Sequence, residues 1–163
     1  MAKIVKVYRE KMPDAVLIGK VYHDEDRNAQ QTFSSKWAEW FQKGWFDTLC
    51  ALNSSLGEDY VGAMRMNGDV FEYWIGMIMK SGTKAPDGFE EIAVAGSDYA
   101  VAWIKGHDDG QLYSMHEDCM KAFADGDYKL AASPWYIERY NCPRFTQPDE
   151  NGEVILDYMT SLK

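Results

Sequence analysis

The most constraining feature of this chain is an order of predicted elements that occurs twice. Strand–strand–helix–strand–strand is found in the first half and again in the second. Tyr99, in the second strand of the later copy, lies 82 positions after Leu17, and Glu153 lies 83 positions after Val70. Both offsets are close to half of the 163 residues. We interpret them as the mark of an internal duplication.

Alternating apolar residues and turn signals predict the strands of both copies. The predicted strands span residues 3–9, 15–22, 60–66, 70–79, 89–95, 98–105, 134–140 and 153–162. Asn67-Gly68-Asp69 is a hairpin turn, because Asn and Gly tolerate positive φ. One helix follows the polar stretch 23–31 and continues to Leu52, with apolar residues at every fourth position. A second helix is predicted at about 111–124.

These elements predict an α+β fold. Two such halves give an antiparallel sheet with both helices on one side, and a cleft is expected where the copies meet. Connections within each copy are short, so we expect a single domain over 1–163. Its pseudo-repeats are placed at about 1–80 and 88–163.

Charge and hydropathy narrow the function classes. The net charge of −9 repels a phosphate backbone, so direct nucleic-acid binding is not expected. No apolar run approaches membrane-spanning length, and the N-terminus alternates at once without an apolar signal core. The three cysteines are widely spaced and odd in number, which is typical of a reduced compartment. We therefore predict a cytoplasmic protein without a membrane partner.

The strand at 134–140 carries the most distinctive side chains. Alternation along a strand places Tyr136, Glu138 and Tyr140 on one face. The residues alone leave two interpretations open. Glu138 is either solvated on an outward face, with the tyrosines as amphipathic cover, or enclosed by their rings.

Four motifs extend this pattern along the chain. They are Tyr73-Trp74-Ile75-Gly76, Pro86-Asp87-Gly88-Phe89-Glu90, Tyr99-Ala100-Val101-Ala102-Trp103 before Gly106, and Glu138-Arg139-Tyr140. In their order and spacing the chain resembles the GyrI-like effector-binding domains, which also form the drug-sensing part of AraC- and MerR-type bacterial regulators. The last motif stands where the family has Glu-x-Tyr.

The resemblance implies a tandem of two strand–helix–strand–strand units around a central pocket, in which Glu138 lies among aromatic rings and faces lipophilic, cationic compounds. It also implies a free-standing small-molecule-binding protein for drug sensing or sequestration, since no helix-turn-helix segment is recognised. The candidate ligand-binding residues are Glu138, Tyr136, Tyr140, Tyr73, Trp74, Tyr99, Trp103 and Trp37. Strand parity leaves open which member of each neighbouring aromatic pair faces the ligand. Trp37 belongs to a ring-dense helical stripe that suits a core as well as a pocket.

Two other functions stay open. Some GyrI-like proteins are hydrolases that open the cyclopropane ring of DNA-alkylating natural products, in which case Glu138 would be the general acid and base. Another family member binds DNA gyrase, so a protein partner is an alternative. Binding is favoured over hydrolysis because a single carboxylate is a minimal catalytic set. No cofactor is expected, and His116 and Cys119, three apart on a helix, find no third ligand at metal-site spacing.

Overall fold

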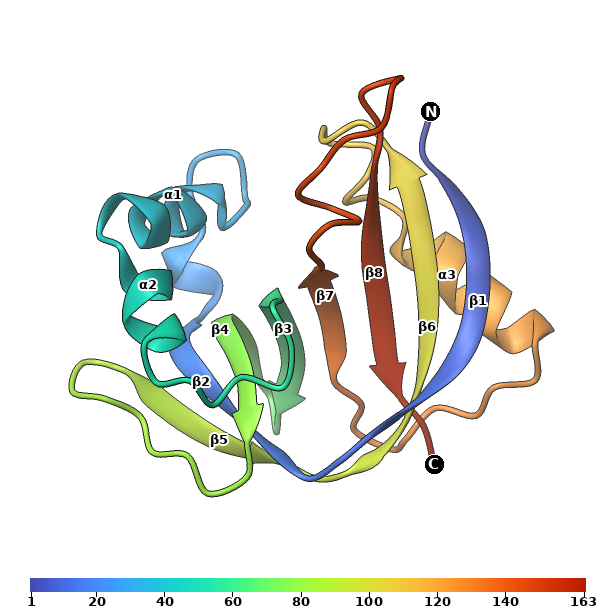
Figure 1. The fold of residues 1–163 in the computed structure, drawn as a ribbon. Helices are drawn as coiled ribbons and strands as arrows, with labels where there is room; N and C mark the ends of the chain where they lie inside the picture. The colour runs from blue at the N-terminus through green and yellow to red at the C-terminus, as the bar shows by residue number, and fades with distance from the viewer. The chain divides into compact units, whose positions relative to one another are not determined.

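The computed structural model describes residues 1–163 as eight strands, three α-helices and one 3-10 helix. All of the strand pairs within its compact units are antiparallel. There are two such units, which we call the middle unit (Asp14–Ala95) and the terminal unit (Met1–Pro13 with Gly96–Lys163) (Figure 1). The predicted α+β class with antiparallel sheet is confirmed.

The terminal unit contains four strands and one helix. They are β1 (Lys3–Met12), β6 (Ser97–Gly106), α3 (His116–Asp125), β7 (Tyr136–Tyr140) and β8 (Val154–Ser161). The strands are hydrogen-bonded in the order β1-β6-β8-β7. Helix α3 lies behind the strands in the view of Figure 1 and buries Cys119 and Phe123.

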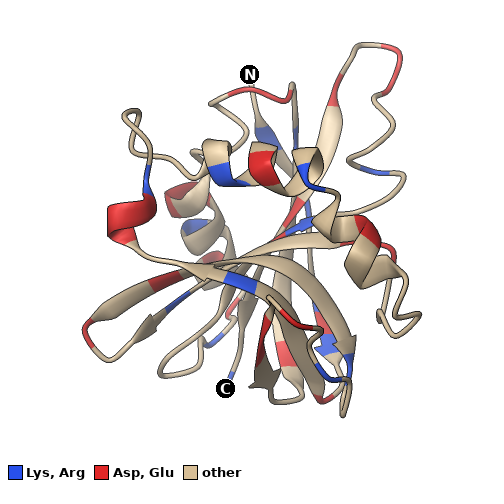
Figure 2. Cartoon of the chain, turned by 90° about the vertical axis from the view of Figure 1, so that its left-hand side faces the viewer, with Lys and Arg blue, Asp and Glu red and all other residues tan.

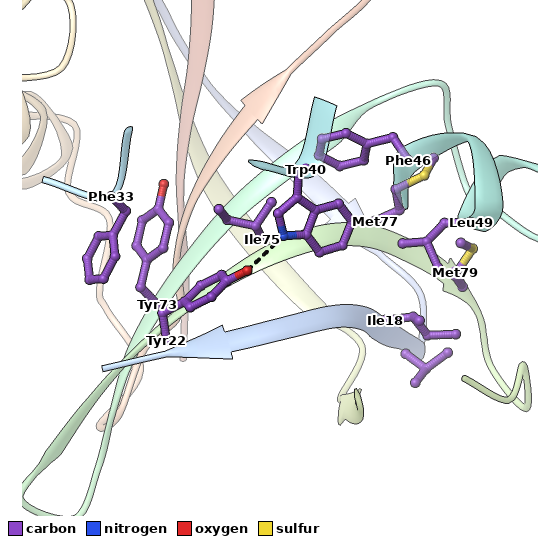
Figure 3. Close-up of a cluster of buried hydrophobic side chains, with 11 residues drawn as sticks. Ile18, Tyr22, Phe33, Trp40, Phe46, Leu49, Tyr73, Ile75, Met77 and Met79 are labelled. Atoms are coloured by element: carbon purple, nitrogen blue, oxygen red, sulfur yellow. Dashed lines mark hydrogen bonds between the residues drawn. The ribbon is translucent and has the colours of Figure 1, made fainter. Parts of the chain in front are cut away.

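The middle unit has the same strand–helix–strand–strand order followed by an edge strand. Its elements are β2 (Ala15–Tyr22), η1 (Asp24–Asp26), α1 (Ser34–Gln42), α2 (Trp45–Cys50), β3 (Tyr60–Asn67), β4 (Val70–Lys80) and β5 (Glu90–Val94). The strand order is β3-β4-β2-β5. Alternate residues of β2 and β4, such as Ile18 and Met77, pack against Trp40, Phe46 and Leu49 of the helices (Figure 3).

The edge strand of each unit comes from the other sequence repeat. β1 pairs with β6 and not with its chain neighbour β2, while β5 pairs with β2 and not with β6. The compact units therefore divide the chain at 13/14 and 95/96, whereas the sequence pattern places the repeats at 1–80 and 88–163. Turn residues show where the chain turns but do not specify which strand is the partner. The predicted central pocket stays a prediction.

The single helix predicted up to Leu52 is wrong. α1 ends at Gln42 and α2 begins at Trp45, because Gly44 takes a left-handed conformation with φ 68°. The second helix begins at His116, five residues later than predicted, and the residues before it form turns. The break turns α2 so that Phe46 and Leu49 are both buried beside Trp40.

Acidic and basic residues are interspersed along the chain. Figure 2 shows Lys and Arg scattered among Asp and Glu and not gathered in one basic segment. The net charge of −9 thus arises from acidic residues in many elements. None of the helices combines the length and hydropathy that crossing a membrane requires.

Candidate functional site

Strand β7 presents the predicted carboxylate between two phenols. Its register with β8 is continuous from Tyr136 to Arg139, so Tyr136, Glu138 and Tyr140 share one face. The Tyr140 hydroxyl donates a hydrogen bond to Glu138 Oε1 at 3.2 Å. All three residues are half-buried. The alternation predicted from the sequence is therefore present, and the carboxylate is neither fully solvated nor sealed in the core.

Two further residues complete this face, and sequence reasoning missed both. Tyr158 of β8 lies directly opposite Glu138, and its ring stacks on Tyr136 at 6.5 Å between centroids. His116, at the start of α3, makes edge contacts with the rings of Tyr136 (5.3 Å) and Tyr158 (5.7 Å). Its Nδ1 is 2.5 Å from the Tyr158 hydroxyl. We call Tyr136, Glu138, Tyr140, Tyr158 and His116 the Glu138 cluster.

A signal for one of these residues was present in the sequence. Because the last strand alternates, Tyr158 is on the same face as Leu156 and Thr160, and the register with β7 decides that this face carries Glu138. That register could not be obtained from local pattern. Nothing local marks His116, which sequence reasoning considered only as a metal ligand.

Carboxylates dominate the electrostatics around this face. Burial, reinforced by the charge of Glu138, raises the pKa of the Tyr158 hydroxyl. Burial also raises the pKa of Tyr113, which donates a hydrogen bond to Asp108 and lies in the fields of Glu138 and Asp109. Glu138, Asp108 and Asp109 all disfavour a further negative charge at this face. A cationic group placed beside Glu138 would be stabilised by the same fields.

An ion-pair network occupies the opposite face of the same strands. Asp157 is fully buried and accepts hydrogen bonds from Arg139 Nε (2.8 Å) and from Arg144 Nε (3.2 Å) and Nη2 (2.5 Å). The other two nitrogens of the Arg139 guanidinium donate to Glu10 of β1 at 2.8 and 3.0 Å. Arg139 directly follows Glu138, and Asp157 directly precedes Tyr158. The network therefore fixes the register that places Glu138 and Tyr158 opposite each other.

Two predicted site residues lie on the network face. Trp103 is in register with Asp157, and its Nε1 donates to the Tyr8 hydroxyl at 3.3 Å. The Arg144 guanidinium lies over the Trp103 ring at 4.6 Å. Tyr99 has the same strand parity as Trp103 and is buried, which raises the pKa of its hydroxyl to about 12. Within the terminal unit, both therefore lie on the face opposite Glu138.

The remaining three predicted residues belong to the middle unit. Tyr73 stacks on Phe33 with centroids 4.3 Å apart (Figure 3). The Trp37 Nε1 donates to the Tyr73 hydroxyl at 2.9 Å. Trp74 points to the other face of β4, where its Nε1 donates to Glu72 Oε1 at 3.1 Å. The sequence left open which of Tyr73 and Trp74 faces the helices, and the structure places Tyr73 on that side.

A cation already lies on the aromatic rings of the middle unit. The Arg27 guanidinium lies 4.6 Å from the Phe33 ring centroid and 5.3 Å from that of Phe71. Asp24 and the Gln31 carbonyl hold this guanidinium at 3.0 and 2.9 Å. The rings of this unit thus already bind a protein cation.

Comparison with known proteins places the fold but not the family. No protein-family model matches the chain, and no curated protein matches it. A candidate bacterial transcription regulation protein from Staphylococcus aureus MU50 matches with a TM-score of 0.68 at 17% identity, covering 97% of this chain and 98% of that one. SAV2435, solved bound to tetraphenylphosphonium, matches with a TM-score of 0.69 at 18% identity, covering 98% and 94%.

A third solved structure has the same fold. The C-terminal domain of EcmrR matches with a TM-score of 0.60 at 12% identity, covering 97% of each chain. These identities are low, so the comparisons show a common fold over nearly the whole chain. The expected α+β architecture thus has three solved counterparts.

Proposed function

We propose that this chain is a GyrI-like small-molecule-binding protein that holds lipophilic, cationic aromatic compounds at the Glu138 cluster. The observation that carries the proposal is the half-buried carboxylate of Glu138 between Tyr136 and Tyr140 and opposite Tyr158. The solved fold counterparts support it, because one of them was crystallised with a lipophilic cation.

The chemistry of the cluster favours a cation of low hydration. Removing a carboxylate from water is costly unless it is paired or hydrogen-bonded, and a bound cation supplies the pairing. Each ring face adds cation–π attraction of about 0.5–2 kcal/mol. A cation whose charge is spread over aromatic groups loses little hydration on entering, so these gains exceed its desolvation cost. Hard, strongly hydrated cations should bind weakly.

The charge of the ligand can be tested without changing its shape. Tetraphenylphosphonium and tetraphenylborate are nearly isosteric ions of opposite sign, and neither titrates. We expect the cation to bind more tightly, and Glu138→Gln to weaken it by about 10- to 100-fold, since Gln keeps the shape but loses the charge. Glu150→Gln, which changes an exposed carboxylate before β8, is the matched control. Equal losses for the cation in the two variants would refute the assignment of Glu138.

Hydrolysis of a strained ring is the second candidate, favoured by the hydrogen bond from Tyr140 to Glu138. A carboxyl held by a phenol can donate a proton and then, as carboxylate, activate water. The deciding assay incubates excess cyclopropane-bearing alkylator with the protein and measures ring-opened product by mass spectrometry. Product beyond one equivalent, lost in Glu138→Gln, would establish an enzyme. We expect a plateau at or below one equivalent.

A further inference from the structure

The Glu138 cluster contains a histidine that the proposed function does not use. His116 is exposed at the start of α3, yet its ring contacts both Tyr136 and Tyr158. Its Nδ1 is 2.5 Å from the Tyr158 hydroxyl, and Tyr158 is the cross-strand neighbour of Glu138. An imidazole, the side chain that most often switches charge in proteins, is thus in hydrogen-bond contact with the cross-strand neighbour of the carboxylate.

We propose that His116 is a specificity-determining residue that makes binding of cations at the Glu138 cluster depend on pH. This inference rests on the proposed function. Neutral His116 leaves the negative charge of Glu138 available to a cationic ligand. Protonated His116 adds a positive charge to the same cluster, where it attracts Glu138 and repels the ligand.

The hydrogen bond persists through this change of charge. A phenol both donates and accepts, so Tyr158 donates to Nδ1 when the ring is neutral and accepts from Nδ1–H when it is protonated. Protonation therefore changes the charge of the cluster without requiring a rearrangement of the rings. The expected effect is electrostatic, which makes it separable from a folding defect.

The titratable groups near His116 come from several elements. Its ring contacts Tyr136 of β7 and Tyr158 of β8, and Glu117 and Asp118 directly follow it in α3. The charge of Glu138 acts on both Tyr158 and Tyr113, and Tyr113 also lies in the fields of Asp108 and Asp109. Lys3 of β1 and Lys121 line a shallow depression beside α3 with Asp118, and Lys121 is paired with Asp125 at 2.7 Å. Carboxylates thus outnumber the cations around this end of α3.

Tetraphenylphosphonium is the probe, because its charge does not change with pH. Its dissociation constant is measured by Trp fluorescence at pH 8.0 and 5.5 for the natural sequence, His116→Gln and His116→Arg. Moving from pH 8.0 to 5.5 should weaken binding to the natural sequence by about threefold more than binding to His116→Gln, the effect of one charge about 6 Å away at the dielectric constant of water. The comparison with His116→Gln removes the pH effects that do not depend on His116.

Two further variants separate the charge of His116 from other effects of low pH and from the effects of other histidines. His116→Arg carries a permanent charge, so it should show at pH 8.0 the weakening that the natural sequence shows only at pH 5.5. His107→Gln changes an exposed histidine that contacts the Gly152 carbonyl, and it should keep the full pH step. An equal pH step in the natural sequence and His116→Gln would overturn the inference alone. Absence of binding at both pH values would overturn the proposed function and the inference with it.

Discussion

Asp157 offers a stability test of the framework that positions the Glu138 cluster. This carboxylate is fully buried, and it accepts hydrogen bonds from two guanidinium groups, Arg139 and Arg144. Asp157→Asn keeps the volume and one acceptor but removes the charge and turns an NH₂ group toward the arginines. Arg139 would then keep only Glu10 as its charged partner in this network.

The expected loss of stability follows from the burial of both Arg139 and Asp157. The Arg139 side chain is 12% exposed and Asp157 is 0% exposed. Burial opposes the charge of Arg139, but its bonds to Glu10 and the charge of Asp157 outweigh this and raise its pKa. Breaking a buried pair at one partner costs about 3–5 kcal/mol, because the other charge stays buried. For a chain of this size each kcal/mol lowers Tm by about 2–4 °C, so the expected loss is about 6–20 °C.

Thermal unfolding followed by circular dichroism measures this loss. Asp98→Asn is the matched control, because Asp98 pairs with Arg9 at 3.1 Å while both side chains are substantially exposed. Such a pair contributes about 0–1 kcal/mol. The natural sequence and both variants should be compared at pH 7 and at one ionic strength. A loss in Asp157→Asn no larger than that in Asp98→Asn would show that the buried network does not hold these strands together.

Three further predictions concern stability. Gly76→Ala should lower the free energy of unfolding by about 3 kcal/mol or more, because its Cβ would lie 2.1 Å from the Ile18 carbonyl oxygen. Gly68→Ala, in an open turn with φ 62°, should lower it by only about 1–2 kcal/mol. Equal losses for the two variants in urea unfolding would contradict this difference. Tyr22→Phe should cost about 1–3 kcal/mol, because it leaves the buried Trp40 Nε1 without its acceptor at 3.0 Å, and a neutral result would mean that this indole finds another partner. The hydrogen bond from Arg139 lowers the pKa of Glu10 below its ordinary 4.5. The stabilisation that ionised Glu10 provides is therefore complete above pH 4.5 and is lost as pH falls through the lower, folded-state pKa. Glu10→Gln should flatten the fall in unfolding free energy below pH 4.5, and an unchanged slope would refute this prediction.

Local pattern was sufficient for most of the strands and for the alternation of β7. Glu138, Tyr136 and Tyr140 share a face as predicted, because side-chain alternation is a local property of any strand. The Asn67-Gly68-Asp69 turn joins β3 and β4 as predicted, with Gly68 at φ 62°. Such features depend on a few adjacent residues, and so the sequence carries them directly.

Features that depend on distant residues could not be obtained in this way. The pairing of β1 with β6 joins residues about ninety positions apart, and no turn signal specifies it. The position of Tyr158 opposite Glu138 depends on the same kind of non-local register. His116 reaches the cluster only because α3 begins at that residue, and the apolar periodicity placed the start of this helix five residues too early. The break at Gly44 shows the converse case, in which a local glycine signal was outweighed by an apolar stripe running across it.

The location of a bound cation tests the central claim most directly. Tetraphenylarsonium has the shape and charge of tetraphenylphosphonium, and its arsenic gives an anomalous signal in a crystal. We predict one strong anomalous peak per chain within about 6 Å of the rings of Tyr136, Tyr140 or Tyr158, the range of a cation–π contact, and adjacent to the Glu138 carboxylate. A sole peak on the network face, over Trp103 and away from Glu138, would contradict the account.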